Sequence, residues 1–258
     1  MEGKNRFSLV VITKNEENNI GACLKSVPFA DEVIVVDSGS TDRTKEIVEG
    51  LKARFIHNDW PGYGKQKQFA LDKASHDWVL LLDADEYLDE NLQAEIKSLL
   101  AGGPTEDAYR IPRKQIFMGK LCHYGKSVDH PVRLTNRRKG SYDLKNIHES
   151  FVTKGSLGTL KNFMIHNSGI TVLDRCKKIM RDFELELQNN NSPDMTAAKV
   201  VFDPIRYFLS YYLRHQGYRD GFAGYVMTAL FALQMFIQNA GQYEKNLFKP
   251  ANQKIDRN

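Results

Sequence analysis

The chain has 258 residues, 41% hydrophobic and 26% charged, which is ordinary for a globular protein and allows one large domain or a domain with an additional segment. Its net charge of +4 suits phosphate-bearing partners but is too small to indicate nucleic-acid binding by itself. The three cysteines are scattered and form no CxxC pair, which argues against a disulfide framework or a structural zinc site and indicates a reducing compartment.

The first part of the chain alternates between two hydrophobic patterns. Short apolar runs at 7–12, 32–36, 55–57 and 78–82 predict buried strands, and the first run is a strand rather than a signal peptide. Helical spacing of apolar residues predicts helices after Asn15, after Thr44 and after Gly62, with Asn15 as a helix cap. Because strands and helices alternate, the crossovers predict parallel strand pairing in one sheet.

The second part of the chain changes character after Gly102-Gly103-Pro104. Shorter strands are expected at 108–112, 132–135 and 151–153, separated by basic loops that contain glycine. After Gly169 the spacing predicts helices at 172–187, 200–215 and 222–240. No stretch offers the roughly 20 consecutive apolar residues that span a bilayer, so we expect no membrane span.

The strand at 78–82 ends at two aspartates, Asp83 and Asp85. Side chains two residues apart in extended chain point to one side, and ligands of parallel α/β sheets collect at the carboxyl ends of strands. Two carboxylates there form a hard-oxygen site for Mg²⁺ or Mn²⁺ that substrate phosphates complete. The alternative is an aspartate-rich turn before a helix near Asn91, with Asp89 as its cap, and the motif alone leaves both interpretations open.

Polar residues also follow the first two strands, at 13–17 and 37–42. In a parallel sheet these ends emerge at the same edge as the aspartate pair, where one nucleotide could touch all three. The backbone of Thr13 can pair with a base edge, and Asp37 can accept a hydrogen bond from a base or ribose. Asp42 is better explained as a residue that stabilises a turn or caps a helix. No GxGxxG follows a strand, so a dinucleotide-binding fingerprint is absent.

Three segments, VVITKNEENNI, VIVVDSGSTDRT and LLLDADE, in that order and spacing, resemble the nucleotide-sugar-binding half of inverting GT-A glycosyltransferases of family 2. The later stretches Val132-Arg133-Leu134 and Lys145-Asn146-Ile147-His148-Glu149 are similar to the bacterial branch that adds glucose to the inner core of lipopolysaccharide or lipooligosaccharide. The resemblance covers most of residues 6–240. It implies an α/β GT-A (nucleotide-diphospho-sugar transferase) fold with a mostly parallel central sheet flanked by helices and a C-terminal helical extension.

We therefore expect a GT-A catalytic domain at 1–168, with a donor-binding half at 6–101 and a half at 102–168 that carries the acceptor site and the base. A helical extension follows at 169–247, and the polar tail at 248–258 is expected to be disordered.

The resemblance also implies roles for individual residues. Thr13, Glu16 and Asp37 would hold uridine. Asp83 and Asp85, with Ala84 between them, would bind the donor through a Mg²⁺ or Mn²⁺ ion that bridges its diphosphate, and His166 is a further candidate metal ligand. Lys65, ahead of a helix N-terminus, would add positive charge near the phosphates, unless it is simply a solvated surface lysine.

An inverting displacement needs a carboxylate that takes the proton from the acceptor hydroxyl as this attacks the anomeric carbon. Glu149 stands where the family carries its His-Glu pair, and the alternative is that it only pairs with Arg133 or a neighbouring lysine. Acceptor binding is expected of Arg110, Arg133 and His148, because arginine makes bidentate contacts with phosphate or carboxylate groups. Scattered solvent-facing charge is the competing explanation.

The implied function is metal-dependent, inverting transfer of one hexose, glucose from UDP-glucose, to a heptose of the lipopolysaccharide inner core. No QxxRW motif appears, which speaks against a processive polysaccharide synthase, and Asp37-Ser38 stands where many relatives have two aspartates. One alternative is a transferase of the same fold that acts on polyprenyl phosphate or a peptide side chain. The other is a non-catalytic nucleotide-binding scaffold.

The helices expected at 200–215 and 222–240 are rich in aromatic residues, with Arg206, Arg214 and Arg219 interleaved. A basic amphipathic helix with aromatic residues can lie in a membrane interface. Because the acceptor that the resemblance implies is a lipid-linked saccharide, we expect peripheral contact with the cytoplasmic face of the bacterial inner membrane. Packing of these helices against each other or in a homodimer is the alternative.

Overall fold

The computed structural model describes residues 5–143, 150–169, 171–188 and 195–248. The chain forms two compact units, of which the first comprises Met1–Ile116 and Asp129–Ser168 and the second comprises Phe117–Val128 and Gly169–Asn258. The chain leaves the first unit through β7 (Arg113–Phe117) and returns to it through β9 (Val128–Asp129).

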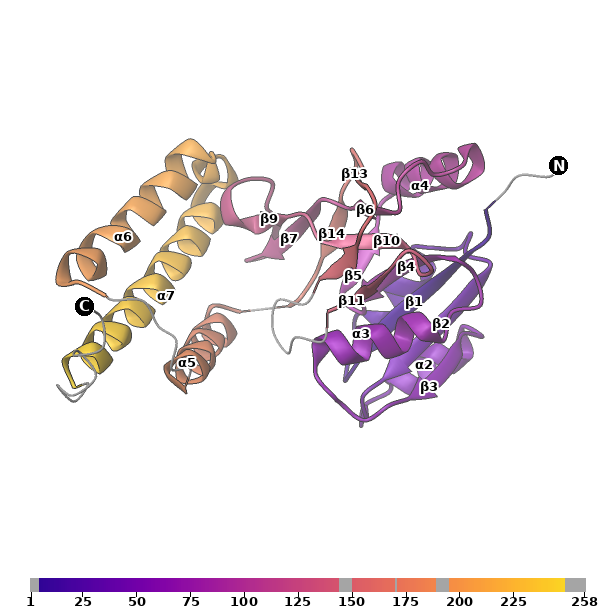
Figure 1. Ribbon diagram of the computed structural model, residues 1–258, viewed down its shortest axis with the longest axis horizontal. Coiled ribbons are helices and arrows are strands. Elements are labelled where there is room, and N and C mark those ends of the chain that lie inside the picture. The colour runs from indigo at the N-terminus through magenta and orange to yellow at the C-terminus, as the bar shows by residue number, and fades with distance from the viewer. Residues whose placement is uncertain (1–4, 144–149, 170, 189–194, 249–258) are drawn as a thin grey trace. The chain divides into compact units, whose positions relative to one another are not determined.

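A seven-stranded sheet in the order β13-β6-β10-β4-β1-β2-β3 forms the centre of the first unit (Figure 1). β1 runs parallel to β2 and β4, and β2 runs parallel to β3, whereas β10 is antiparallel to both β4 and β6. The mostly parallel sheet is confirmed, and the strand expected at 132–135 is the one that interrupts the parallel order. The bounds of these strands are β1 (Phe7–Thr13), β2 (Glu32–Asp37), β3 (Arg54–His57), β4 (Trp78–Asp83), β6 (Ala108–Arg110), β10 (Val132–Asn136) and β13 (Leu157–Thr159).

Helices and short strands surround this sheet. A smaller sheet is formed where β14 pairs antiparallel with β5 and parallel with β7, and β11 pairs with β12 in a two-stranded ribbon. The bounds are α1 (Ile20–Lys25), α2 (Thr44–Gly50), α3 (Tyr63–Asp72), α4 (Glu90–Gly102), β5 (Glu86–Leu88), β11 (Gly140–Tyr142), β12 (Phe151–Thr153) and β14 (Met164–His166).

Both faces of β1 and β4 are covered, which explains why their sequences show no polar alternation. One hydrophobic cluster joins Leu9 and Leu80 to residues of α1, α2 and α4, and a second joins Val10 and Leu81 to residues of α3. All seven residues of β1 are buried. The ends of these strands are therefore held rigidly by the core, which is what a site at the sheet edge requires.

The expected cap at Asn15 was wrong, whereas the cap at Asp89 is confirmed. Asn15 has a positive φ of 55°, and its Oδ1 accepts a hydrogen bond from the Thr41 backbone N–H at 2.8 Å. Asparagine tolerates this left-handed conformation, so the residue joins the loops after β1 and β2 instead of starting a helix. Asp89 Oδ1 accepts from the Leu92 N–H at 2.9 Å at the start of α4.

The second unit is helical. Its small core contains Phe117, Cys122 and Met227, and α6 packs along α7. The buried carboxylate of Asp220 accepts hydrogen bonds from the backbone N–H groups of His123 and Tyr124, both at 2.9 Å, which ties residues 117–128 to the helices. The bounds are β8 (Lys120–Leu121), η1 (Gly125–Ser127), α5 (Val172–Gln188), α6 (Ala197–Leu209), the π-helical turn η2 (Ser210–Arg214), the 3₁₀ turn η3 (Gly217–Asp220) and α7 (Gly221–Leu247).

One helix bears on the expectation that no stretch spans a membrane. Within the described residues, the helical stretch Gly217–Leu247 is long and apolar enough to cross a bilayer, judged by length and composition only. About a third of its most apolar window (33%) is buried inside the structure. Glycine, threonine and glutamine interrupt its apolar run without adding charge, so no 20 consecutive residues are apolar.

Candidate active site

The polar ends of three strands meet at one edge of the sheet. In the register of the parallel pairs, Thr13 lies opposite Asp37, and Ile12 lies opposite Asp83. The Ser38 N–H donates to the Thr13 carbonyl at 3.0 Å, so the loops that follow β1 and β2 are joined directly. The convergence that parallel strand order predicted is therefore present in the structure.

Asp83, the last residue of β4, is held by two buried cations. Arg133 on β10 donates from Nη2 to Asp83 Oδ2 at 2.5 Å, and Lys67 Nζ lies 3.3 Å from Asp83 Oδ1. Lys67 is 2% exposed and Arg133 is 4% exposed. Burial alone would raise the pKa of Asp83, but the charges of Arg133 and Lys67 outweigh it and hold that pKa well below its usual value. Asp83 is therefore an anion throughout the physiological pH range.

Glu86, fully buried at the start of β5, completes this network. Its Oε1 accepts from Arg133 Nη2 at 2.6 Å and from Arg113 Nη1 at 2.7 Å, and its Oε2 accepts from the Asp83 backbone N–H at 3.1 Å. Arg133 thus bridges carboxylates from β4 and β5, which follow each other in the chain but belong to different sheets. The turn between β4 and β5, which contains Asp85, is fixed from both sides.

Asp85 and His166 form a second polar pair at this edge, from the β4–β5 turn and from β14. His166 Nε2 lies 3.0 Å from Asp85 Oδ2, and each side chain is 18% exposed. Burial lowers the pKa of His166, but the hydrogen bond and charge of Asp85 outweigh it and raise that pKa above its usual value. Burial and, to a smaller extent, the charge of Asp85 raise the pKa of Glu16, so Glu16 shares this acidic surrounding.

The chemistry of these side chains fits a divalent cation that a substrate helps to bind. Among the described residues, no three His, Cys, Asp or Glu side chains are grouped as a complete metal site. Asp85 and His166 offer a carboxylate and an imidazole side by side. Asp83 Oδ1 is ion-paired with Lys67 Nζ and accepts no hydrogen bond in the described part of the chain. Such a set leaves coordination positions that phosphate oxygens can fill.

The Asp37 carboxylate is engaged by its own loop. Its Oδ2 accepts from the backbone N–H groups of Gly39 and Ser40, both at 2.8 Å, and its Oδ1 accepts from the Ser40 hydroxyl. Gly39 has a φ of +89°, a conformation that side chains rarely adopt. Gln66 of α3 donates to Ser38 Oγ at 3.0 Å. Asp37 therefore shapes the loop at the end of β2.

The other predicted site residues lie in different surroundings. Thr13 is 6% exposed and Ala84 is 3% exposed, both at the sheet edge. Lys65 is exposed in the first turn of α3, and Arg110 is partly buried at the end of β6. Glu149 and His148 lie outside the described residues.

Sequence reasoning missed Lys67 and Arg113, and it included Glu86 only as the last residue of the acidic stretch after β4. Lys67 lies three and four residues before Ala70 and Leu71, on the buried face of α3, so helical spacing could have shown that it points toward the sheet. No local pattern marks Glu86 or Arg113, because their pairing depends on how β5, β14 and β7 assemble.

Replacing Arg133 with methionine removes the cation that Asp83 and Glu86 share while keeping much of the side-chain volume. Because the fully buried Glu86 and the partly buried Asp83 lose a partner, we expect the free energy of unfolding to fall by about 3–5 kcal/mol. Arg138→Met is the matched control: its arginine is 71% exposed and pairs with Asp77 at 2.6 Å, so it should cost less than about 1 kcal/mol. Urea unfolding measures both values, and equal losses would contradict the buried network.

Comparison with known proteins gives consistent matches. Residues 8–149 match the family described as Glycosyl transferase family 2. The lipopolysaccharide core biosynthesis glycosyltransferase LpsC of Rhizobium meliloti is 31% identical, covering 94% of this chain and 94% of its own. An uncharacterized glycosyltransferase of Rickettsia typhi is 30% identical, covering 94% of this chain and 88% of its own.

Two solved structures are also similar. A crystal structure of Staphylococcus aureus TarS 1–349 shares 15% identity and a TM-score of 0.49, covering 95% of this chain and 93% of that one. Glucosyl-3-phosphoglycerate synthase of Mycobacterium tuberculosis, in complex with Mn²⁺, UDP and phosphoglyceric acid, shares 26% identity and a TM-score of 0.35, covering 45% and 44%. The family match over more than half of the sequence, together with the nearly full-length likeness to LpsC, shows that the chain belongs to glycosyl transferase family 2 and has the GT-A-like fold of a glycosyltransferase.

Proposed function

We propose that this glycosyltransferase moves one glucose from UDP-glucose to a heptose of a lipid-linked lipopolysaccharide inner-core saccharide, with inversion, at the cytoplasmic face of the inner membrane. The observation that carries the proposal is the acidic turn after β4, where Asp85 lies beside His166 at the edge on which β1 and β2 also end. The acceptor class is supported by the nearly full-length likeness to LpsC, a protein of lipopolysaccharide core biosynthesis.

Thr13, Glu16 and the loop of Asp37 are the proposed uridine contacts. The Asp37 carboxylate already accepts hydrogen bonds from the backbone N–H groups of Gly39 and Ser40. Its proposed contribution is therefore to fix the loop against which a nucleoside would lie. The Thr13 carbonyl accepts a hydrogen bond from the Ser38 N–H, which joins the loops after β1 and β2. The exposed ammonium of Lys65, in the first turn of α3, is the proposed source of additional positive charge near the phosphates.

Asp85 and His166 are the proposed protein ligands of a Mg²⁺ or Mn²⁺ ion, with Asp83 as the further carboxylate of the set. When bound, the ion supplies a Lewis acid that stabilises negative charge on the departing UDP. Lys67 and Arg133 hold the Asp83 carboxylate ionised and oriented before any substrate arrives, so the acidic turn is pre-organised.

Glu149 is the proposed general base. It would take the proton from the acceptor hydroxyl while that oxygen attacks the anomeric carbon and the bond from the sugar to the diphosphate breaks. Arg110 and His148 are proposed to contact the acceptor. The sequence analysis assigned Arg133 to the acceptor. Its Nη2 donates to Asp83 and Glu86, and its Nε has no hydrogen-bond partner among the described residues, so its proposed role is to position the acidic turn.

The proposal is tested by measuring UDP release from a panel of UDP-hexoses, with heptose-containing core lipid as acceptor. We expect release with UDP-glucose that requires both the acceptor and added Mg²⁺ or Mn²⁺, and that stops in EDTA. UDP with Mn²⁺ should also raise the thermal unfolding temperature, since a ligand at about 100 times its Kd stabilises the folded state by about 2.7 kcal/mol. Neither release nor thermal stabilisation would favour a non-catalytic scaffold.

A further inference from the structure

One solvent-exposed row of side chains along α6 and the following turn η2 is apolar. Val201, Ile205, Leu209 and Leu213 recur every four residues, and each is 49–55% exposed. Four-residue spacing places side chains in one row on a helix. A row of this kind normally packs against another element, but here it remains open in the described structure.

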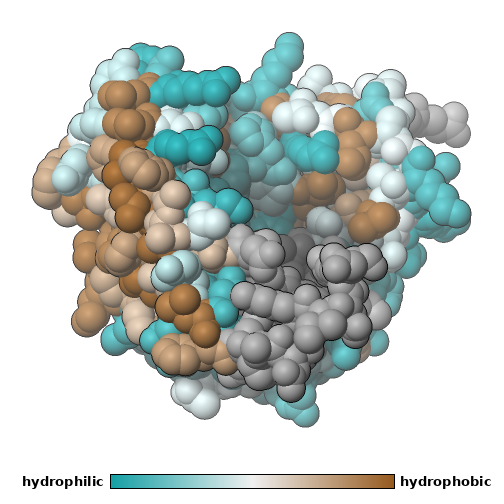
Figure 2. All heavy atoms as spheres, turned by 60° about the vertical axis from the view of Figure 1, so that its left-hand side comes forward, coloured by the Kyte–Doolittle hydropathy of each residue, from teal (hydrophilic) through white to brown (hydrophobic). Residues whose placement is uncertain are grey.

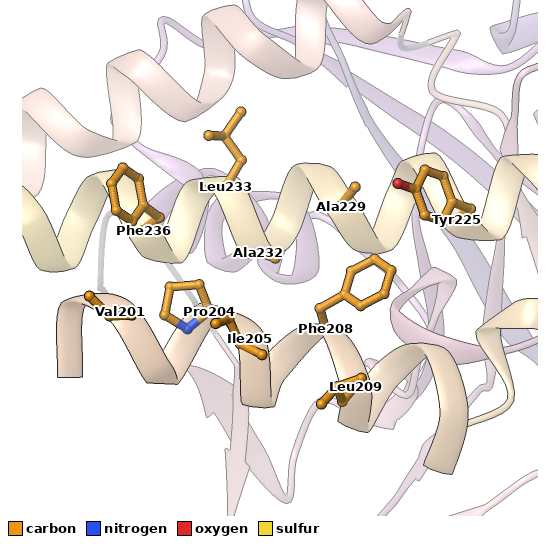
Figure 3. A pocket seen from close by; sticks show the side chains of 10 residues that line it. All are labelled: Val201, Pro204, Ile205, Phe208, Leu209, Tyr225, Ala229, Ala232, Leu233 and Phe236. Carbon is orange, nitrogen blue, oxygen red and sulfur yellow. The ribbon is translucent and has the colours of Figure 1, made fainter. Parts of the chain in front are cut away.

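A matching row lies on α7. Phe222, Tyr225, Leu233 and Phe236 follow helical spacing and are 44–71% exposed. Between the two rows runs a groove of about 540 Å³ whose lining residues, in the described chain, include no charged side chain (Figure 3). Figure 2 shows hydrophobic residues gathered in a band on this side of the second unit. We call the two rows and the groove the α6–α7 face.

The charges beside the α6–α7 face have one predominant sign. The segment 196–220 carries four basic residues and two acidic ones, and the carboxylate of Asp220 is buried against backbone N–H groups. Arg206 is 81% exposed, and its contact with Asp203 is long, at 3.9 Å. From Gly221 to Tyr243 the sequence contains no charged residue. An uncharged strip bordered by cations results.

One aromatic residue of the α6–α7 face, Tyr225, carries a polar hydroxyl on an apolar ring. Tyr225 packs against Phe208, with ring centroids 5.7 Å apart, and against Tyr212 at 5.9 Å. Tyrosine rings of this kind are favoured where an apolar medium meets water.

We propose that the α6–α7 face is a docking surface for an anionic lipid bilayer. The apolar rows enter the boundary between headgroups and acyl chains, and the bordering arginines and lysine contact lipid phosphates. The opposite side of α7 is covered by the core of its own unit, through Ala223, Met227 and Leu230, so α7 lies in the plane of the interface and does not cross the bilayer. The cationic border selects an anionic lipid surface over an uncharged protein partner.

Sedimentation with vesicles tests this surface without donor or acceptor, so its result is independent of the proposed function. The full chain should bind phosphatidylcholine vesicles that contain phosphatidylglycerol. The double variant Leu209→Glu with Leu233→Glu should lower the partition coefficient by about tenfold or more, because each change removes apolar burial and adds charge. Leu51→Glu, at a side chain of the first unit that is 37% exposed, introduces the same charge elsewhere and should bind as the unchanged chain does.

A second double variant, Arg206→Gln with Arg214→Gln, leaves the apolar rows intact. It should weaken binding to anionic vesicles by about fivefold per charge and leave binding to pure phosphatidylcholine unchanged. The proposal is overturned if the unchanged chain stays in the supernatant, or if it resists extraction by alkaline carbonate as a spanning protein does. It is also overturned if the first double variant dissociates a dimer without changing lipid binding.

Discussion

Replacing Asp85 with asparagine is expected to lower kcat for UDP release by about three orders of magnitude. The change removes the negative charge from the proposed metal ligand but hardly alters its size, and metal stabilisation of the leaving group is worth several kcal/mol at about 1.36 kcal/mol per factor of ten. The side chain is 18% exposed and lies against His166, so the thermal unfolding temperature should change little. Steady-state UDP release over a range of Mn²⁺ concentrations measures the effect.

The matched control is Asp89→Asn, the same chemical change four residues further along the chain. Asp89 caps α4 through the Leu92 N–H, and asparagine is an equally good cap, so both stability and activity should stay close to their original values. If Asp85→Asn retained activity at every metal concentration, the metal would not be bound at this turn. If both variants lost activity, the effect would be a general disturbance of the segment after β4.

The sheet was predictable because its central strands are buried on both faces. The runs at 7–12 and 78–82 contain no polar alternation, as is typical of a strand that is buried on both faces. The prediction that Asn15 caps a helix was wrong because its side chain instead accepts a hydrogen bond from Thr41, which is 26 residues away. Likewise, nothing in residues 117–128 indicated that their backbone would be bound by Asp220.

The location of the candidate site at one edge of the sheet was predictable from the sequence, but the ion pairs around Asp83 were not. Parallel order alone brings Thr13, Asp37 and Asp83 together, since each ends a neighbouring strand. The surroundings of Asp83 depend on β10 and α3, which supply Arg133 and Lys67. These ion pairs join residues that are far apart in the sequence and follow from tertiary packing. The spacing of residues within β10 does not reveal them.

Replacing Glu149 with glutamine separates the two acceptor classes. With a heptose hydroxyl as acceptor, the base must remove a proton in the transition state, so we expect kcat to fall by about 10²- to 10⁴-fold. A polyprenyl phosphate attacks through an oxygen that is already ionised, so with that acceptor the variant should keep most of its activity. Thermal stabilisation by UDP with Mn²⁺ should be the same in the variant and the unchanged chain, because the base contacts the acceptor and not the nucleotide.

Asp143→Asn controls for disturbance of the segment that contains Glu149. Asp143 Oδ1 accepts from the Ser150 N–H at 3.1 Å, so the change weakens a contact that flanks the same segment without removing the proposed base. We expect its kcat to stay within a few-fold of the original value, since one exposed hydrogen bond contributes about 1 kcal/mol or less. A loss as large as that of Glu149→Gln would show that activity depends on the fold of the segment. Undiminished transfer to core lipid by Glu149→Gln would instead mean that another group takes the proton.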